Sequence, residues 1–177
     1  YLSAQLSWNP SANADEIISE FVETVYGKAA PQVTEWLQLI VSPFKDKNVT
    51  MGIYDLPTAP YLSAEILKKS DELMEQARQA AAGDENALAA IAKLQMSIDY
   101  TTIARMKVAP RKIDGQFTFG LSEEDLTRID RWMASMNQFE VKRIQEGTIF
   151  NEKTVISRKY AEAPVLTLEN EFLRAEI

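Results

Sequence analysis

Four polar residues divide this chain into helices. Asn13, Ser63, Asp84 and Ser122 each precede a segment whose apolar residues recur every three or four positions. Such side chains accept hydrogen bonds from backbone N–H groups of the first helical turn, which have no partner within the helix. At Asn13 and Ser122 an acidic residue three positions later completes a capping-box pattern. The sequence therefore predicts a mainly helical fold.

The caps and the apolar period together predict five helices. Their expected ranges are 13–27, 31–42, 63–83, 84–106 and 122–147. The third and fourth helices are joined by a tight turn at Gly83 and Asp84, so they form an antiparallel αα-hairpin in this interpretation. Eight alanines between 77 and 92 let the two helices approach closely near this turn. We expect an all-α helical bundle containing this αα-hairpin, plus a short C-terminal β segment.

Several segments do not follow the helical period. Residues 43–60 hold three prolines and a glycine, so they predict a long loop, and 110–121 is a second irregular segment. A short helix is expected over 154–160. From Pro164 onward the pattern Val-Leu-Thr-Leu favours a strand. The domain prediction is therefore a helical domain over 1–163, followed by the start of a β-sandwich or a linker over 164–177.

Charge and composition exclude several classes of function. The 177 residues carry a net charge of −7 and contain neither cysteine nor histidine. An acidic chain lacks the basic face that nucleic acid or anionic lipid requires, and no apolar run is long enough for a membrane helix. The composition also removes disulfides, thiolate or imidazole metal ligands and histidine-dependent nucleophiles. We predict no cofactor, no metal site and no catalytic residue.

Two carboxylates on helices are candidates for burial. Asp99 shares a helix row with Met96, Ile103 and Met106, and Asp71 lies between Leu67 and Met74. Desolvation raises the pKa of a buried carboxyl group, which a general acid requires. The alternative is a structural role, in which each carboxylate forms an ion pair or binds backbone groups.

The long loop contains a second candidate group. Tyr54 and Tyr61 flank Asp55 at a spacing that offers two aromatic rings and one carboxylate. Such a set suits the rim of a sugar-binding cleft. The alternative is that these side chains pack the loop against a neighbouring domain.

Several motifs together resemble a known group of proteins. They are Trp8-Asn-Pro10, the helix end Glu20 to Pro31, and Pro60-Tyr61-Leu-Ser63-Ala-Glu65 opening an alanine-rich helix. They resemble the helical region after the catalytic barrel in a family of uncharacterised bacterial glycoside-hydrolase-like proteins. That family is distantly similar to α-glucuronidases and β-hexosaminidases. The C-terminal residues 168–177 resemble the first strands of the β-sandwich modules that often follow.

The resemblance implies a non-catalytic accessory domain that supports a catalytic barrel in bacterial polysaccharide degradation. Residues 1–9 would then be the last helix of the barrel. The implied partners are that barrel, the following β-sandwich and carbohydrate, and the implied location is periplasmic, cell-surface or secreted. The family's catalytic carboxylates belong to the barrel, so none is assigned here. The alternative is a helical protein-interaction or oligomerisation module without a carbohydrate role.

Overall fold

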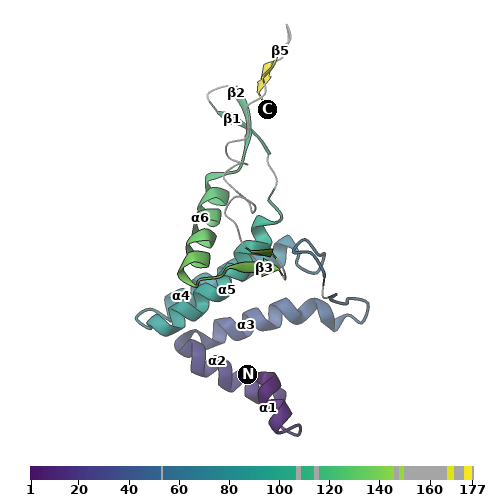
Figure 1. Ribbon diagram of the computed structural model, residues 1–177, viewed down its shortest axis with the longest axis vertical. Helices are drawn as coiled ribbons and strands as arrows, with labels where there is room; N and C mark the ends of the chain where they lie inside the picture. The colour runs from purple at the N-terminus through teal and green to yellow at the C-terminus, as the bar shows by residue number, and fades with distance from the viewer. Residues whose placement is uncertain are drawn as a thin grey trace. The chain divides into compact units, whose positions relative to one another are not determined.

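The computed structural model describes residues 1–52, 54–106, 109–113, 116–145, 148–149, 167–169 and 174–176 (Figure 1). Two compact units divide the chain, Tyr1–Thr101 and Thr102–Ile177. The described part is mostly helical, as the capping signals and apolar periods predict.

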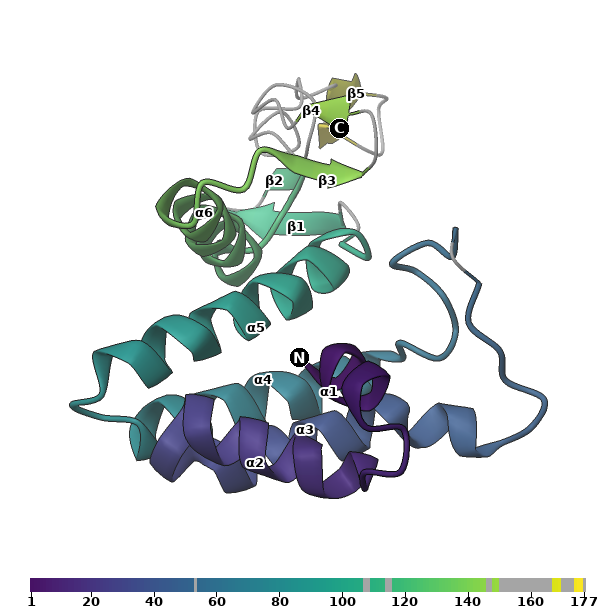
Figure 2. The ribbon, with the colours of Figure 1, turned by 60° about the horizontal axis from the view of Figure 1, so that its bottom comes forward.

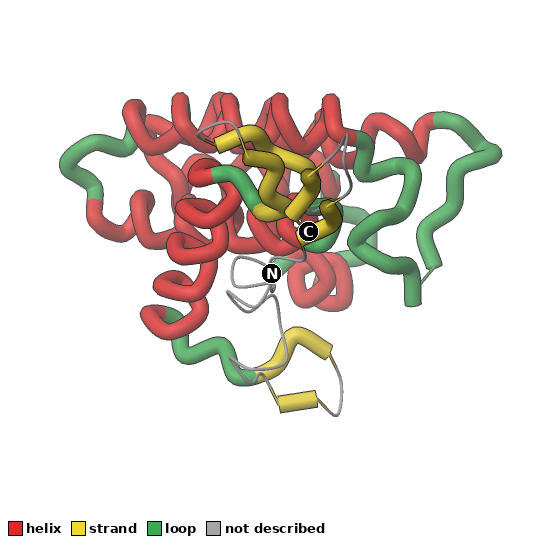
Figure 3. The backbone as a smooth tube through the Cα atoms, turned by 90° about the horizontal axis from the view of Figure 1, so that it is seen from above, coloured by secondary structure: helices red, strands yellow, loops and turns green. Residues whose placement is uncertain are grey.

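Among its described residues, the first unit contains helices and connecting loops but no strand. The helices are α1 Leu2–Trp8, α2 Ala14–Tyr26, the 3-10 helix η1 Gly27–Ala29, α3 Ala30–Val41, the 3-10 helix η2 Ser42–Lys45, α4 Ala64–Ala80 and α5 Glu85–Ile103, which ends just past the unit boundary. α3 packs against both α2 and α4, and the three lie side by side in Figure 2. After η2, residues 46–52 and 54–63 belong to a long loop before α4 that projects away from the helices (Figures 2 and 3).

The predicted caps start the helices. Asn13 Oδ1 accepts the backbone N–H groups of Asp15 and Glu16 at 3.0 and 3.5 Å. Ser63 Oγ accepts the N–H of Ile66 at 3.2 Å, and Asp84 Oδ1 accepts that of Ala87 at 3.0 Å. Each bond satisfies a donor that has no partner within its helix.

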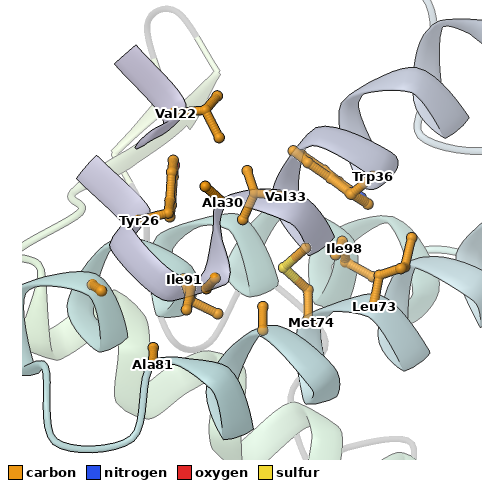
Figure 4. Packing of buried hydrophobic residues seen from close by; sticks show 13 residues of the cluster. Val22, Tyr26, Ala30, Val33, Trp36, Leu73, Met74, Ala81, Ile91 and Ile98 are labelled. Carbon is orange, nitrogen blue, oxygen red and sulfur yellow. The ribbon is translucent and has the colours of Figure 1, made fainter. Parts of the chain in front are cut away.

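A single hydrophobic core holds α2, α3, α4 and α5 together. Val33, Leu73, Met74 and Ile91 are at most 1% exposed. Figure 4 shows Val33 and Trp36 of α3 facing Met74 and Leu73 of α4. Small residues at the α4–α5 turn, including Ala77, Ala81 and Ala87, are also buried.

The second unit contains one described helix and short antiparallel strand pairs. α6 spans Glu123–Gln138, and the pairs are β1 Ala109–Ile113 with β2 Gln116–Gly120, β3 Arg143–Gln145 with β4 Thr148–Ile149, and β5 Thr167–Glu169 with β6 Arg174–Glu176 (Figure 3). The irregular segment expected at 110–121 is therefore mostly a hairpin. The reason is visible in Gln116-Phe-Thr-Phe-Gly120, where polar and apolar residues alternate with the period of a strand. The helix expected over 154–160 lies outside the described residues.

α6 begins as predicted but ends earlier. Asp125 N–H donates to Ser122 Oγ, and Ser122 N–H donates to Asp125 Oδ2, both at 3.0 Å, which completes a capping box. The expected stop at Gly147 is wrong, because Glu140 adopts a positive φ of 52°. The N–H of Val141 then donates to the carbonyl of Met136 at 2.9 Å, which closes the helix as a Schellman motif.

Candidate functional site

The α3–α4 loop brings two of its three predicted site residues together. The Tyr61 hydroxyl donates to Asp55 Oδ2 at 3.1 Å, and the N–H of Gly52 donates to the same oxygen at 2.8 Å. Asp55 N–H in turn donates to the carbonyl of Gly52 at 3.1 Å. The carboxylate is thus fixed by its own turn and by a tyrosine six residues later.

The ring of Tyr61 also packs against Phe44 of η2. The two ring centroids are 4.9 Å apart with the rings tilted by 55°. Partial burial, followed by the hydrogen bond and the negative charge of Asp55, raises the pKa of Tyr61 above its ordinary value. The shift is in the direction expected for a hydroxyl that donates to a carboxylate.

Asp55 and Tyr61 line an open cavity of about 670 Å³. Its other polar lining residues are Asn48, Thr50 and Thr58. Asp46 Oδ1 orders this side of the loop, since it accepts the backbone N–H and the side-chain amide of Asn48 at 2.9 and 3.0 Å. The long loop is thus a folded segment with a concave face.

Tyr54 does not join this group. Its side chain is 89% exposed, and it does not line the cavity. The sequence places Tyr54 beside Asp55, but Tyr54 lies in the turn that the hydrogen bond from Asp55 N–H to the Gly52 carbonyl closes, and its side chain is in solvent. The predicted pair of tyrosines around one carboxylate is therefore reduced to Tyr61 and Asp55.

The two predicted buried carboxylates meet at a single amide. Gln95 of α5 donates through Nε2 to Asp71 Oδ1 at 2.8 Å and to Asp99 Oδ1 at 3.0 Å. Asp99 is 1% exposed, as expected, whereas Asp71 is half-buried. Arg78 Nη1 donates to Gln95 Oε1 at 3.1 Å, and its guanidinium also binds Glu75. The arrangement links α4 to α5 through a polar chain, which favours the structural interpretation of both carboxylates.

Gln95 and Arg78 were not predicted from the sequence. The available signal was the spacing: Gln95 precedes Asp99 by four residues and so shares its face of the helix. Its partner Asp71 lies on another helix, which a pattern along one helix does not reveal.

α1 and α2 expose several large apolar side chains. Trp8 is 90% exposed and Tyr1 is 56% exposed, and Ile18 and Phe21 are partly exposed. Tyr1 stacks on Phe21 with ring centroids 5.2 Å apart, so the end of α1 is attached to α2. We call Tyr1, Trp8, Ile18 and Phe21 the N-terminal apolar group. Exposed aromatic residues of this size are typical of contact surfaces.

Comparison with known proteins gives one family match. A family model described as "Domain of unknown function (DUF4838)" matches residues 1–38. The match covers α1, α2, η1 and most of α3, including the whole N-terminal apolar group. The search of curated proteins found no match, and neither did the search of solved structures.

Two further properties concern the described residues only. None of their helices is both long enough and apolar enough to cross a membrane. Within the same part of the chain, no group of three or more acidic, histidine or cysteine side chains is arranged to hold a metal ion.

Proposed function

We propose that this chain is a non-catalytic helical accessory domain of a bacterial glycoside-hydrolase-like protein and that it supports the catalytic barrel. The observation that carries the proposal is the exposure of Trp8 together with Tyr1, Ile18 and Phe21. Burying a large aromatic side chain at an interface stabilises association strongly, and such residues are frequent binding hot spots. In this proposal, residues 1–9 continue the barrel and α2 docks against it.

The helical core provides the rigid part of this domain. The proposal treats α4 and α5 as an antiparallel αα-hairpin within a helical bundle, joined by the Gln95 hydrogen bonds and by the alanines near their turn. It treats residues 164–177 as the entry to a following β-sandwich. The implied location remains periplasmic, cell-surface or secreted, and the implied partners are the two neighbouring domains and carbohydrate.

The alternative is a helical protein-interaction or oligomerisation module without a carbohydrate role. The same N-terminal apolar group supports it, because an exposed tryptophan fits any protein partner. The nature of the segment encoded before Tyr1 separates the two. A repeating strand–helix pattern there supports the accessory domain, and a signal peptide or an unrelated linker supports the alternative.

A binding experiment tests the docking itself. The segment encoded before Tyr1 is produced together with residues 1–9 as a separate protein and mixed with residues 10–177, and association is measured by sedimentation velocity. We expect a one-to-one complex that Trp8→Ala weakens at least about tenfold. Met51→Ala serves as the matched control, because Met51 is 70% exposed but lies in the α3–α4 loop. Equal weakening by both substitutions would contradict docking through the N-terminal apolar group.

A further inference from the structure

The cavity in the α3–α4 loop is lined by one charged side chain. One carboxylate, that of Asp55, lines it, whereas the other polar lining side chains are the neutral Asn48, Thr50, Thr58 and Tyr61. No lysine or arginine is among the lining residues. An anionic ligand would lie near Asp55 with no lining cation to offset the repulsion. The lining therefore favours a ligand without negative charge.

The remaining lining is apolar. Pro43, Val49, Leu56, Ala59 and Pro60 complete the cavity. Its volume of about 670 Å³ falls within the roughly 300–1,000 Å³ of small-molecule sites, which combine an apolar wall with a few placed polar groups. The ligand that matches this lining has an apolar face and several neutral hydrogen-bonding groups at its edge.

The carboxylate of Asp55 is positioned to accept hydrogen bonds from such groups. Its Oδ2 already accepts two hydrogen bonds, from Gly52 N–H and from the Tyr61 hydroxyl, which fix the plane of the carboxylate. Every described hydrogen bond to this side chain ends on Oδ2, which leaves Oδ1 to accept from a ligand. A hydrogen bond from a hydroxyl group to a charged oxygen is stronger than one between neutral groups.

We propose that this cavity binds a neutral saccharide. The C–H face of a sugar ring lies against the apolar lining, hydroxyl groups of the sugar donate to Asp55 Oδ1, and the threonine and asparagine side chains bind the ring edge. The charge of the lining makes the site selective for neutral sugars over uronic acids. The inference rests on the proposed function in that it names the class of carbohydrate, but it is carried by the loop cavity and is independent of docking through α1 and α2.

Direct binding tests the ligand class. The 177-residue chain is titrated calorimetrically with four neutral hexasaccharides (cellohexaose, xylohexaose, mannohexaose and maltohexaose), with an oligogalacturonate as the acidic probe and with a chitosan oligosaccharide as the cationic probe. We expect binding of at least one neutral probe and none of the oligogalacturonate. Absence of binding to all four neutral probes, or tighter binding of either charged probe, overturns the proposal.

Variants locate the binding in the cavity. Asp55→Ala should weaken the affinity for the neutral probe at least about tenfold, the loss expected for one hydrogen bond to a charged group. Tyr61→Phe keeps the ring and removes only the anchor of the carboxylate, so it should weaken binding less than Asp55→Ala does. Lys47→Ala is the control, since Lys47 is an exposed loop residue that does not line the cavity. Unchanged affinity in Asp55→Ala overturns the proposal.

Folding and docking are followed separately in these variants. Circular dichroism of Tyr61→Phe and Asp55→Ala shows whether the helices are intact, and Asp55→Asn, which keeps the side-chain shape and an acceptor for Gly52 N–H and the Tyr61 hydroxyl, tests the role of the charge if Asp55→Ala disturbs the loop. Association through the N-terminal apolar group is unaffected by any of these substitutions, so a failure of saccharide binding leaves the docking proposal standing, and the reverse also holds.

Discussion

Gln95 shows how one neutral residue organises the polar interior of the first unit. Its amide nitrogen donates hydrogen bonds to Asp71 and Asp99, and its amide oxygen accepts one from Arg78. An amide suits this position because it offers two N–H donors and an acceptor without adding charge. Two carboxylates and one guanidinium are thereby joined through a single side chain that is 4% exposed.

Truncating Gln95 should therefore destabilise the fold. We expect Gln95→Ala to lower the free energy of unfolding by about 1–3 kcal/mol, because buried polar groups lose a hydrogen-bond partner. Gln76→Ala, an exposed substitution on α4, should change it by no more than about 0.5 kcal/mol. Urea denaturation of both variants measures the difference, and equal midpoints would show that the Gln95 hydrogen bonds contribute no stability.

Tyr61 offers a test of the loop geometry by titration. Burial and Asp55 raise the pKa of its hydroxyl above the ordinary value, so its hydrogen bond stabilises the loop fully below about pH 10 and is lost as the pH rises through the raised pKa. Ultraviolet difference titration should show one fewer tyrosine with a raised pKa in Tyr61→Phe than in the unmodified chain. Asp55→Asn should lower the pKa of Tyr61. An unchanged titration curve in Asp55→Asn would contradict the contact.

At the scale of elements, the sequence predicts helix starts better than helix ends. Asn13, Ser63 and Ser122 form caps through atoms within three residues of themselves, so their signals are local. The end of α6 escaped prediction because Glu140 occupies a left-handed position that glycine usually takes. The ladder from Ala109 to Gly120 was missed because apolar residues spaced for a strand looked irregular on a helical period.

In the candidate site, too, relations between residues close in the sequence are easier to predict than contacts between distant residues. The sequence places Asp55 and Tyr61, which are six residues apart, in one candidate group, and it marks Asp99 as a candidate for burial. It does not predict the bond from Gln95 to Asp71, which crosses 24 positions. The cavity lining was also beyond prediction, because it depends on how residues from Pro43 to Tyr61 fold back on each other.

The capping box of α6 provides a prediction for a single element. Replacing Ser122 by alanine removes the acceptor for the N–H of Asp125 and should cost about 0.5–2 kcal/mol of stability. Ser122→Asp retains an acceptor and should recover most of it. Thr127→Ala is the control, because Thr127 is an exposed residue of the same helix. Thermal unfolding measures all three, and a Ser122→Ala midpoint equal to that of the control would contradict the capping role.

For the whole molecule, charge and exposed apolar surface act in opposite directions. The chain has a net charge of −7 at pH 7 and a sequence pI near 4.8. Residues 1–27 contain four acidic residues and no lysine or arginine, so the region of the N-terminal apolar group is itself acidic. Like charge opposes self-association at neutral pH, and this opposition vanishes near the pI.

Self-association should therefore depend on pH. Light scattering should increase as the pH falls from 7 towards about 4.8. The net charge of the chain approaches zero near this pH, so the repulsion between copies of the chain becomes small. Trp8→Ala should reduce this increase more than Met51→Ala does, because we expect association to proceed through the N-terminal apolar group. Scattering that is the same at both pH values would contradict the prediction.

The three tryptophans differ so strongly in exposure that they provide a built-in optical reporter. Trp8 is 90% exposed, whereas Trp36 and Trp132 are 8% and 1% exposed. A water-soluble quencher such as acrylamide reaches the indole of Trp8 and is excluded from the other two. The quenchable, red-shifted part of the emission thus comes from one residue of the first helix. A partner that covers this helix would shift that part of the emission to the blue without any label being attached.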